Sequence, residues 1–134
     1  MIKCSLFSKT LGHLDRAFSE SDTQVIVITD TAKLKAVMEA NSRYYLNEAR
    51  VEMHARYLDK GMFEMPLVAP TVDSLKWVEG FHQINAAVNG QLSILPVTTS
   101  ASHAERVKAL VGASAPDSAY EIFDFSECHG VKVA

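Results

Sequence analysis

The stretch from Leu75 to Gly90 carries the pattern in this chain that best suits chemistry, LKWVEGFHQINAAVNG. Gly80 separates an apolar, strand-like run from a helical pattern, and such a junction directs free backbone N–H groups at whatever lies above the helix start. The helix dipole favours an anion there, and His82 and Gln83 in the first turn would add side-chain donors. Phosphate binding is one interpretation of this pattern. The other is a tight connection between two core elements, because glycine turns before helices are common.

Other charged side chains are candidates for the same site. Arg50 and His54 are four residues apart, so a helix places them on one face. They would either contact the ligand of the Gly80 turn or form an ordinary solvated helix face. Arg43 is a further candidate cation. Glu79 is either an ordinary charge at a strand end or a carboxylate that orients a metal or a hydroxyl.

Elsewhere the chain contains no catalytic motif. No P-loop or nucleophile-elbow pattern is present, and Cys4 and Cys128 form neither a C-x-x-C motif nor a disulfide framework. Cys128 and His129 would need two further ligands to hold a metal. Ser102 and Glu105 have the spacing of a capping box, which explains them sufficiently. We therefore assign no catalytic residue and no metal ligand.

Length and composition narrow the class of protein. With 134 residues, 48% of them hydrophobic, we expect a single domain, 1–134, whose core needs no disulfide or metal. The net charge of −3 argues against broad nucleic-acid binding, which normally requires a basic surface. No apolar run is long enough for a membrane span, and no signal peptide is evident. Two cysteines without a disulfide pattern favour a reducing, cytoplasmic location.

Hydrophobic periodicity predicts the elements that position the Gly80 turn. A buried strand over 24–29 leads to a helix that begins at residues 30–31, and Asn47 caps a helix over 47–60. The other predicted elements are strands 66–69, 75–79, 92–97 and 120–125, helix 81–89, and a helix from Ser100 or Ser102 to Gly112.

The two ends of the chain and its prolines give less regular signals. Leu11 to Phe18 fits a short amphipathic helix. Pro66 suits the first position of a strand or an edge strand, and Pro96 suggests an edge strand. Residues 128–134 are expected to fray.

The order of these motifs resembles the ParB/sulfiredoxin superfamily. The residues that carry the resemblance are MPLVA (65–69), LKWVEG (75–80), FHQINAA (81–87), Gly90 and SILPV (93–97). In that superfamily a proline-containing apolar strand precedes a strand that ends in glycine, and a helix with an Ala-Ala pair follows. LVGASAPD (110–117) is also similar to the C-terminal segment of sulfiredoxins. The resemblance covers 47–117, whereas 1–46 match less well.

This resemblance implies an α/β domain with a small mixed sheet and packed helices, in which the glycine turn binds a phosphate or nucleotide. In sulfiredoxins the turn reads Gly-Cys-His-Arg, and the cysteine attacks an activated sulfinate. The matching residues here are Gly80, Phe81, His82 and Gln83, so the nucleophile is missing and a neutral amide replaces the arginine. We therefore expect no sulfinic-acid reduction. The Arg-rich turn of the partition-protein branch is also poorly matched.

Three functions stay open. The leading one is a small binding or regulatory module, a bacterial-type accessory protein with a phosphate or nucleotide pocket at Gly80–Gln83 that Arg50 and His54 help to form. The second is a phosphoryl-transfer or nuclease-type enzyme, for which Glu79 is the obvious carboxylate. The third is a non-catalytic scaffold that binds a protein partner or forms a homodimer. If His82 takes up a proton, anion binding should strengthen toward about pH 6.

Overall fold

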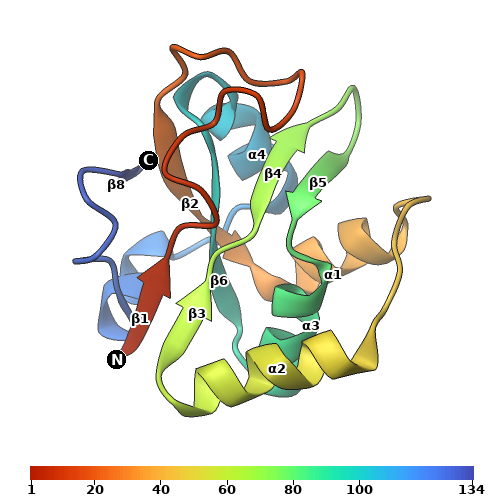
Figure 1. Ribbon diagram of the computed structural model, residues 1–134, viewed down its shortest axis with the longest axis vertical. Coiled ribbons are helices and arrows are strands. Elements are labelled where there is room, and N and C mark those ends of the chain that lie inside the picture. The colour runs from red at the N-terminus through yellow and green to blue at the C-terminus, as the bar shows by residue number, and fades with distance from the viewer.

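Two sheets organise the chain, and the computed structural model describes all of it, residues 1–134 (Figure 1). The larger sheet has five strands in the order β5 (Leu75–Glu79), β4 (Leu67–Pro70), β6 (Ile94–Ser100), β2 (Gln24–Asp30) and β8 (Lys132–Val133). The smaller sheet has the order β3 (Met62–Glu64), β1 (Ile2–Ser5) and β7 (Phe123–Asp124). The fold is α/β, as the sequence predicts, but its strands are divided between two sheets where one was expected.

Four α-helices and two 3-10 helices connect and cover the strands. They are α1 (Thr31–Glu39), α2 (Glu48–Asp59), α3 (Phe81–Asn89), α4 (Ala104–Val111), η1 (Ala101–His103) and η2 (Pro116–Glu121). Figure 1 places α1, α2 and α3 together beside β5, at the right and bottom of the view. None of the helices has both the length and the apolar composition needed to cross a membrane.

The antiparallel pair of β2 and β6 forms the centre of the larger sheet and is in register over the full length of both strands. On its other side β6 pairs with β4 at one position only, Leu67 opposite Thr98. Pro96 therefore stands in an interior strand, so the predicted edge position is wrong. Proline has no N–H to donate to a neighbouring strand. This is tolerated because Pro96, whose partner in β2 is Ile28, does not take part in the single pair between β6 and β4.

A cluster of 20 buried apolar residues joins both sheets to the helices. It includes Phe63 of β3 and Phe123 of β7, whose ring centroids lie 6.5 Å apart. A second, smaller cluster lies under the loop that precedes β2. It consists of Leu11, Phe18, Leu67 and Ala69. Burial of this kind contributes about 1.5–3 kcal/mol for each large apolar side chain, so tertiary packing fixes the elements that surround the Gly80 turn.

The elements next to Gly80 begin and end where the sequence predicts. β5 and α3 match the expected ranges to the residue. Asp30 caps α1 by accepting a hydrogen bond from the Lys33 N–H at 3.0 Å. Asn47 caps α2 in the same way, by accepting from the Arg50 N–H at 3.2 Å. These short-range signals hold because each depends on residues at most three positions apart.

Several expectations near the chain ends are wrong. Residues 11–18 form turns and not a helix, although Leu11 and Phe18 are buried. The strand predicted over 120–125 is shorter than expected, because residues 120–121 end η2, which begins at Pro116, and only the two residues of β7 form a strand. The fixed φ of Pro116 suits the first turn of a helix. The strand prediction rested on the apolar pattern of 120–125 and did not take this proline into account. The segment 128–134, expected to fray, contributes β8 to the larger sheet.

The capping box predicted at Ser102 is also absent. The structure shows no side-chain cap on η1 or α4. The Ser102 hydroxyl lies 2.9 Å from the Ser100 hydroxyl, and Glu105 forms an exposed ion pair with Lys108. A short 3-10 turn precedes α4 and moves Ser102 out of the capping position.

Candidate functional site

Gly80 makes the turn between β5 and α3. Its φ of 148° lies in a region that glycine adopts readily and other residues avoid. A Cβ at this position would stand 2.5 Å from the Cβ of Pro66 and 3.1 Å from Cδ1 of Trp77. Both the backbone conformation and the close packing therefore require glycine at this turn.

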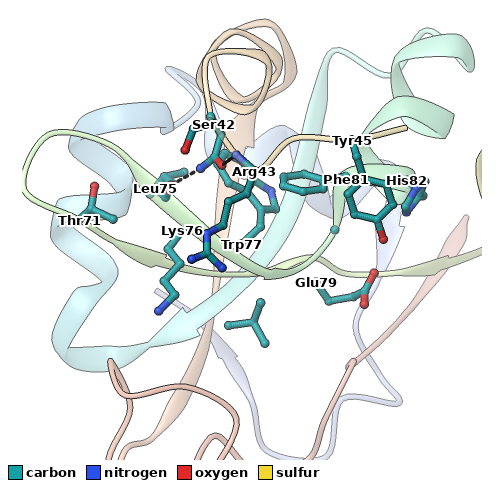
Figure 2. Close-up of a pocket in the computed structure, with 13 residues that line it drawn as sticks. Ser42, Arg43, Tyr45, Thr71, Leu75, Lys76, Trp77, Glu79, Phe81 and His82 are labelled. Atoms are coloured by element: carbon teal, nitrogen blue, oxygen red, sulfur yellow. Dashed lines mark hydrogen bonds between the residues drawn. The ribbon is translucent and has the colours of Figure 1, made fainter. Parts of the chain in front are cut away.

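The turn opens into a pocket of about 560 Å³ between β5 and the chain that links α1 to α2 (Figure 2). All five residues of β5 line one side, and Asn41, Ser42, Arg43 and Tyr45 line the other. The pocket ends at the turn itself, where Gly80, Phe81 and His82 contribute to its surface. Three of the predicted site residues therefore share one cavity.

Aromatic rings form one wall of the pocket. The Phe81 ring centroid lies 5.7 Å from that of Trp77 and 5.9 Å from that of Tyr45. The Tyr45 ring meets Phe81 edge to face, a geometry that aromatic pairs prefer. Phe81, which stands where sulfiredoxins have their nucleophile, thus forms part of an apolar wall.

Two cations and one carboxylate line the same pocket. Figure 2 shows the side chains of Arg43 and Lys76 extending toward the same side, with Glu79 nearer to Tyr45. Arg43 is exposed and forms no ion pair. Lys76 pairs with Asp15 at 2.8 Å. Arg43 is therefore the free positive charge of the pocket.

His82 is held by the chain next to it. Only 2% of the residue is exposed, and its Nε2 accepts a hydrogen bond from the backbone N–H of Asn47 at 3.1 Å. Burial, and after it the charge of Arg50, lowers the pKa of His82, while the charge of Glu79 acts in the opposite direction. A proton on Nε2 would remove the Asn47 hydrogen bond, so this geometry favours a neutral ring.

Gln83 turns away from the pocket, which it does not line. It is fully buried, and its Nε2 donates to Oε1 of Glu64 at 3.0 Å, while its own Oε1 has no partner. Burial and the nearby charge of Glu79 raise the pKa of Glu64, and the hydrogen bond from Gln83 opposes them. The structure thus brings a second carboxylate, Glu64, close to Glu79 behind the turn.

Arg50 and His54 lie beside the pocket and are not part of its lining. The Arg50 guanidinium donates to the hydroxyl of Tyr45 at 3.1 Å. His54 is buried and packs edge to face on the ring of Tyr57 at 5.8 Å. Burial lowers the pKa of His54, and the charge of Glu79 opposes that shift. Arg50 therefore reaches the pocket only through a residue that lines it.

The start of α3 has unused hydrogen-bond donors. No side chain caps this helix, in contrast to α1 and α2. The backbone N–H groups of Phe81, His82 and Gln83 form no hydrogen bond outside the regular elements, and the first N–H groups of a helix have no partner within it. No group of three or more His, Cys, Asp or Glu side chains is arranged to hold a metal ion.

Sequence reasoning did not identify Tyr45 and Lys76 as site residues. Lys76 lies on a strand and Tyr45 in a loop, and neither belongs to a motif. The linking chain reaches β5 through the Asn41 side-chain amide, which donates to the Leu75 carbonyl at 3.1 Å. No local sequence signal indicates this contact, because the two residues are 34 positions apart.

The two buried histidines predict a pH dependence of stability. Since His54 and His82 have pKa values below that of an unfolded chain, about 6.5, the unfolded state binds more protons when the pH falls through that value. We expect the free energy of unfolding to be highest above about pH 6.5 and to fall as the pH is lowered from 7.5 to 6. Urea unfolding at several pH values measures it.

The variants His54→Gln and His82→Gln, combined, should flatten this dependence. Glu64 acts with the opposite sign, because a raised pKa stabilises the fold at low pH and that stabilisation is lost as the pH rises. The comparison is therefore made against wild type over the same interval. His129→Gln, at an exposed position, serves as the control and should leave the slope unchanged. An unaltered slope in the double variant would contradict the assignment.

Comparison with solved structures finds a protein of similar fold. The structure is similar to that of Oncogenic Suppression Activity Protein, a plasmid fertility inhibition factor, crystallised as a gold(I) cyanide derivative. The TM-score is 0.57 at 12% sequence identity, and the likeness covers 69% of this chain and 58% of that one. At this identity the likeness concerns the fold alone. No protein-family model matches the sequence, and no curated protein matches it.

Proposed function

We propose that this chain is a small ParB/sulfiredoxin-like binding or regulatory module that holds a phosphate-bearing ligand at the Gly80 turn. The observation that carries the proposal is the pocket itself, which combines the uncapped start of α3 with the free guanidinium of Arg43. Backbone N–H groups at a helix start and a nearby arginine are suited to a phosphate. The similarity to a plasmid fertility inhibition factor is consistent with a small regulatory protein.

The free positive charge in this proposed site belongs to Arg43 and not to His82, since Lys76 is paired with Asp15. His82 uses its Nε2 to hold Asn47 and has a lowered pKa. We therefore no longer expect anion binding to strengthen toward pH 6 through this residue. The aromatic wall beside Arg43 leaves room for an organic group attached to the phosphate, such as the base of a nucleotide.

A second candidate function is hydrolysis of the bound phosphate ester. The observation that favours it is Glu79, a carboxylate that lines the pocket and would act on the bound ester as general base or general acid. Glu64 lies behind the turn and is not part of that lining. Turnover of a nitrophenyl phosphate that Glu79→Gln abolishes would support this function.

Removing the free guanidinium should weaken phosphate binding. For Arg43→Ala we expect a loss of about three- to tenfold in affinity, corresponding to the roughly 0.7–1.4 kcal/mol of an exposed charged contact. Glu79→Gln should have the opposite effect, because it removes a negative charge from the pocket. Titration of inorganic phosphate and of ATP, followed by calorimetry at low salt, measures both effects.

Lys132→Ala is the matched control, because Lys132 is an exposed cation on β8, at the opposite edge of the sheet from β5. It changes the net charge as Arg43→Ala does, and it should leave the affinity unchanged. Equal weakening by both variants would mean that the effect is one of overall charge. Failure of the wild type to bind either ligand at millimolar concentration would leave the scaffold function as the better proposal.

A further inference from the structure

The pocket continues along the free edge of β5. This strand is the last of the larger sheet and pairs only with β4. At about 3.3 Å per residue, its edge is roughly 16 Å long. A phosphate at the Gly80 turn would occupy one end of that length. The remainder, from Leu75 to Trp77, would face a groove whose other side is lined by Asn41 and Arg43.

Backbone groups of β5 point into this groove. In an antiparallel pair, successive residues alternate between facing the partner strand and facing away from it. Pro70 has no N–H and stands opposite Leu75, so this is a pair without hydrogen bonds. The N–H and C=O of Leu75 therefore face outward, and by the same alternation so do those of Trp77.

One of these outward groups already has a strand-like partner. The Leu75 carbonyl accepts a hydrogen bond from the Asn41 side-chain amide at 3.1 Å, which is drawn as a dashed line at Leu75 in Figure 2. The amide occupies the position that an N–H of a neighbouring strand would take. The backbone N–H groups of Leu75 and Trp77, and the Trp77 carbonyl, make no hydrogen bond outside the pairing with β4. A further strand would pair with these three groups and would take the place of the Asn41 amide at the Leu75 carbonyl.

The charge of the groove selects the kind of strand that fits. Arg43 and Lys76 line it, and Arg43 has no ion pair. An added segment with an acidic group would complement them, whereas a basic segment would be repelled. Glu79 stands at the turn end, so an anionic group there must be held by the backbone N–H groups of α3 and by Arg43.

We propose, building on the phosphate site proposed above, that the ligand is an extended peptide with a phosphorylated serine or threonine. Its backbone adds to β5 as a further strand, and its phosphate lies at the Gly80 turn beside Arg43. Strand addition supplies affinity through main-chain hydrogen bonds, and the phosphate supplies specificity. The phosphate-bearing partner is then a protein, and the pocket acts as a reader of its modified state.

Degenerate phosphopeptides test this proposal on the intact protein. The probes are capped heptapeptide mixtures with a central phosphoserine or phosphothreonine, the same mixtures without phosphate, inorganic phosphate, and ATP. Trp77 is the only tryptophan of the chain and lines the pocket, so its fluorescence reports binding. We expect single phosphopeptides, isolated from the mixtures by their binding, to bind at least about tenfold more tightly than inorganic phosphate, ATP or the same peptides without phosphate.

N-methylation of the tightest phosphopeptide then tests the strand pairing without altering the protein. Methyl groups on one alternate set of amides, those facing β5, should lower the affinity about tenfold or more. Methyl groups on the other set should leave it unchanged. Equal effects of the two sets would overturn the strand addition.

Other results separate this inference from the function on which it rests. If inorganic phosphate and ATP bind but phosphopeptides bind no more tightly, the peptide inference is overturned and the phosphate site stands. Unphosphorylated peptides that bind as tightly as phosphopeptides would also overturn the inference. If no phosphate-bearing probe binds, both proposals fail.

Discussion

Replacing Gly80 with alanine is expected to lower the free energy of unfolding by about 2–5 kcal/mol. Two costs add in this variant. The residue would be forced to keep a φ of 148°, which alanine rarely adopts. Its Cβ would also stand 2.5 Å from the Cβ of Pro66, a distance at which the backbone at residue 80 or at residue 66 must move. Urea or thermal unfolding followed by circular dichroism measures the loss.

Two other glycines separate the two costs. Gly130 has a φ of +87° and nothing within 4 Å of an added Cβ, so Gly130→Ala isolates the backbone cost. Gly112 has a φ of −62°, but its added Cβ would lie 2.5 Å from the Lys108 carbonyl oxygen, so Gly112→Ala isolates the crowding. Each should destabilise the fold less than Gly80→Ala does. A Gly80→Ala protein as stable as wild type would show that the turn is not held as described.

Replacing His82 with alanine is expected to cost about 2–4 kcal/mol of the free energy of unfolding. The substitution removes the acceptor of the Asn47 N–H and leaves a space in a region where His82 is only 2% exposed. Because Asn47 is the N-cap of α2, the loss also frees the start of that helix from α3. Hydrogen exchange at the Asn47 amide should accelerate together with the loss of stability.

The variant His82→Gln is the matched control. The oxygen of a glutamine amide reaches about as far as Nε2 of histidine, so it restores an acceptor for Asn47 without an ionisable ring. Most of the lost stability should return, and the amide of Asn47 should again be protected. If His82→Gln is as unstable as His82→Ala, packing of the ring and not the hydrogen bond holds α2 in place.

The elements around the Gly80 turn were predictable because their signals are local. Gly80 ends β5, Asn89 and Gly90 end α3, and Asp30 and Asn47 cap their helices. Each signal acts over a few residues, so no knowledge of the tertiary fold is needed. The three residues of β3 and the two of β8 could not be predicted in this way, since such short strands depend on their neighbours.

The composition of the pocket was predictable only in part. Gly80, Phe81 and His82 belong to the turn itself, and their motif located them. Arg43 and Lys76 are more than thirty residues apart in the sequence and meet only because Asn41 binds the edge of β5. Sequence spacing carries no information on a contact of that range, so Arg43 was only a further candidate cation and Lys76 was not identified.

The position of β1 between β3 and β7 affects the order in which the chain folds. Residues 2–5 pair on one side with 62–64 and on the other with 123–124, both in parallel. At a synthesis rate of about 5–20 residues per second, β1 waits roughly 6–24 s for its second neighbour. The larger sheet gains its β2–β6 pair after residue 100, roughly 1–5 s before β7 is made. A nascent chain therefore holds an unpaired strand edge until residue 124 has been made, and during that interval the edge is open to chaperones and to other chains.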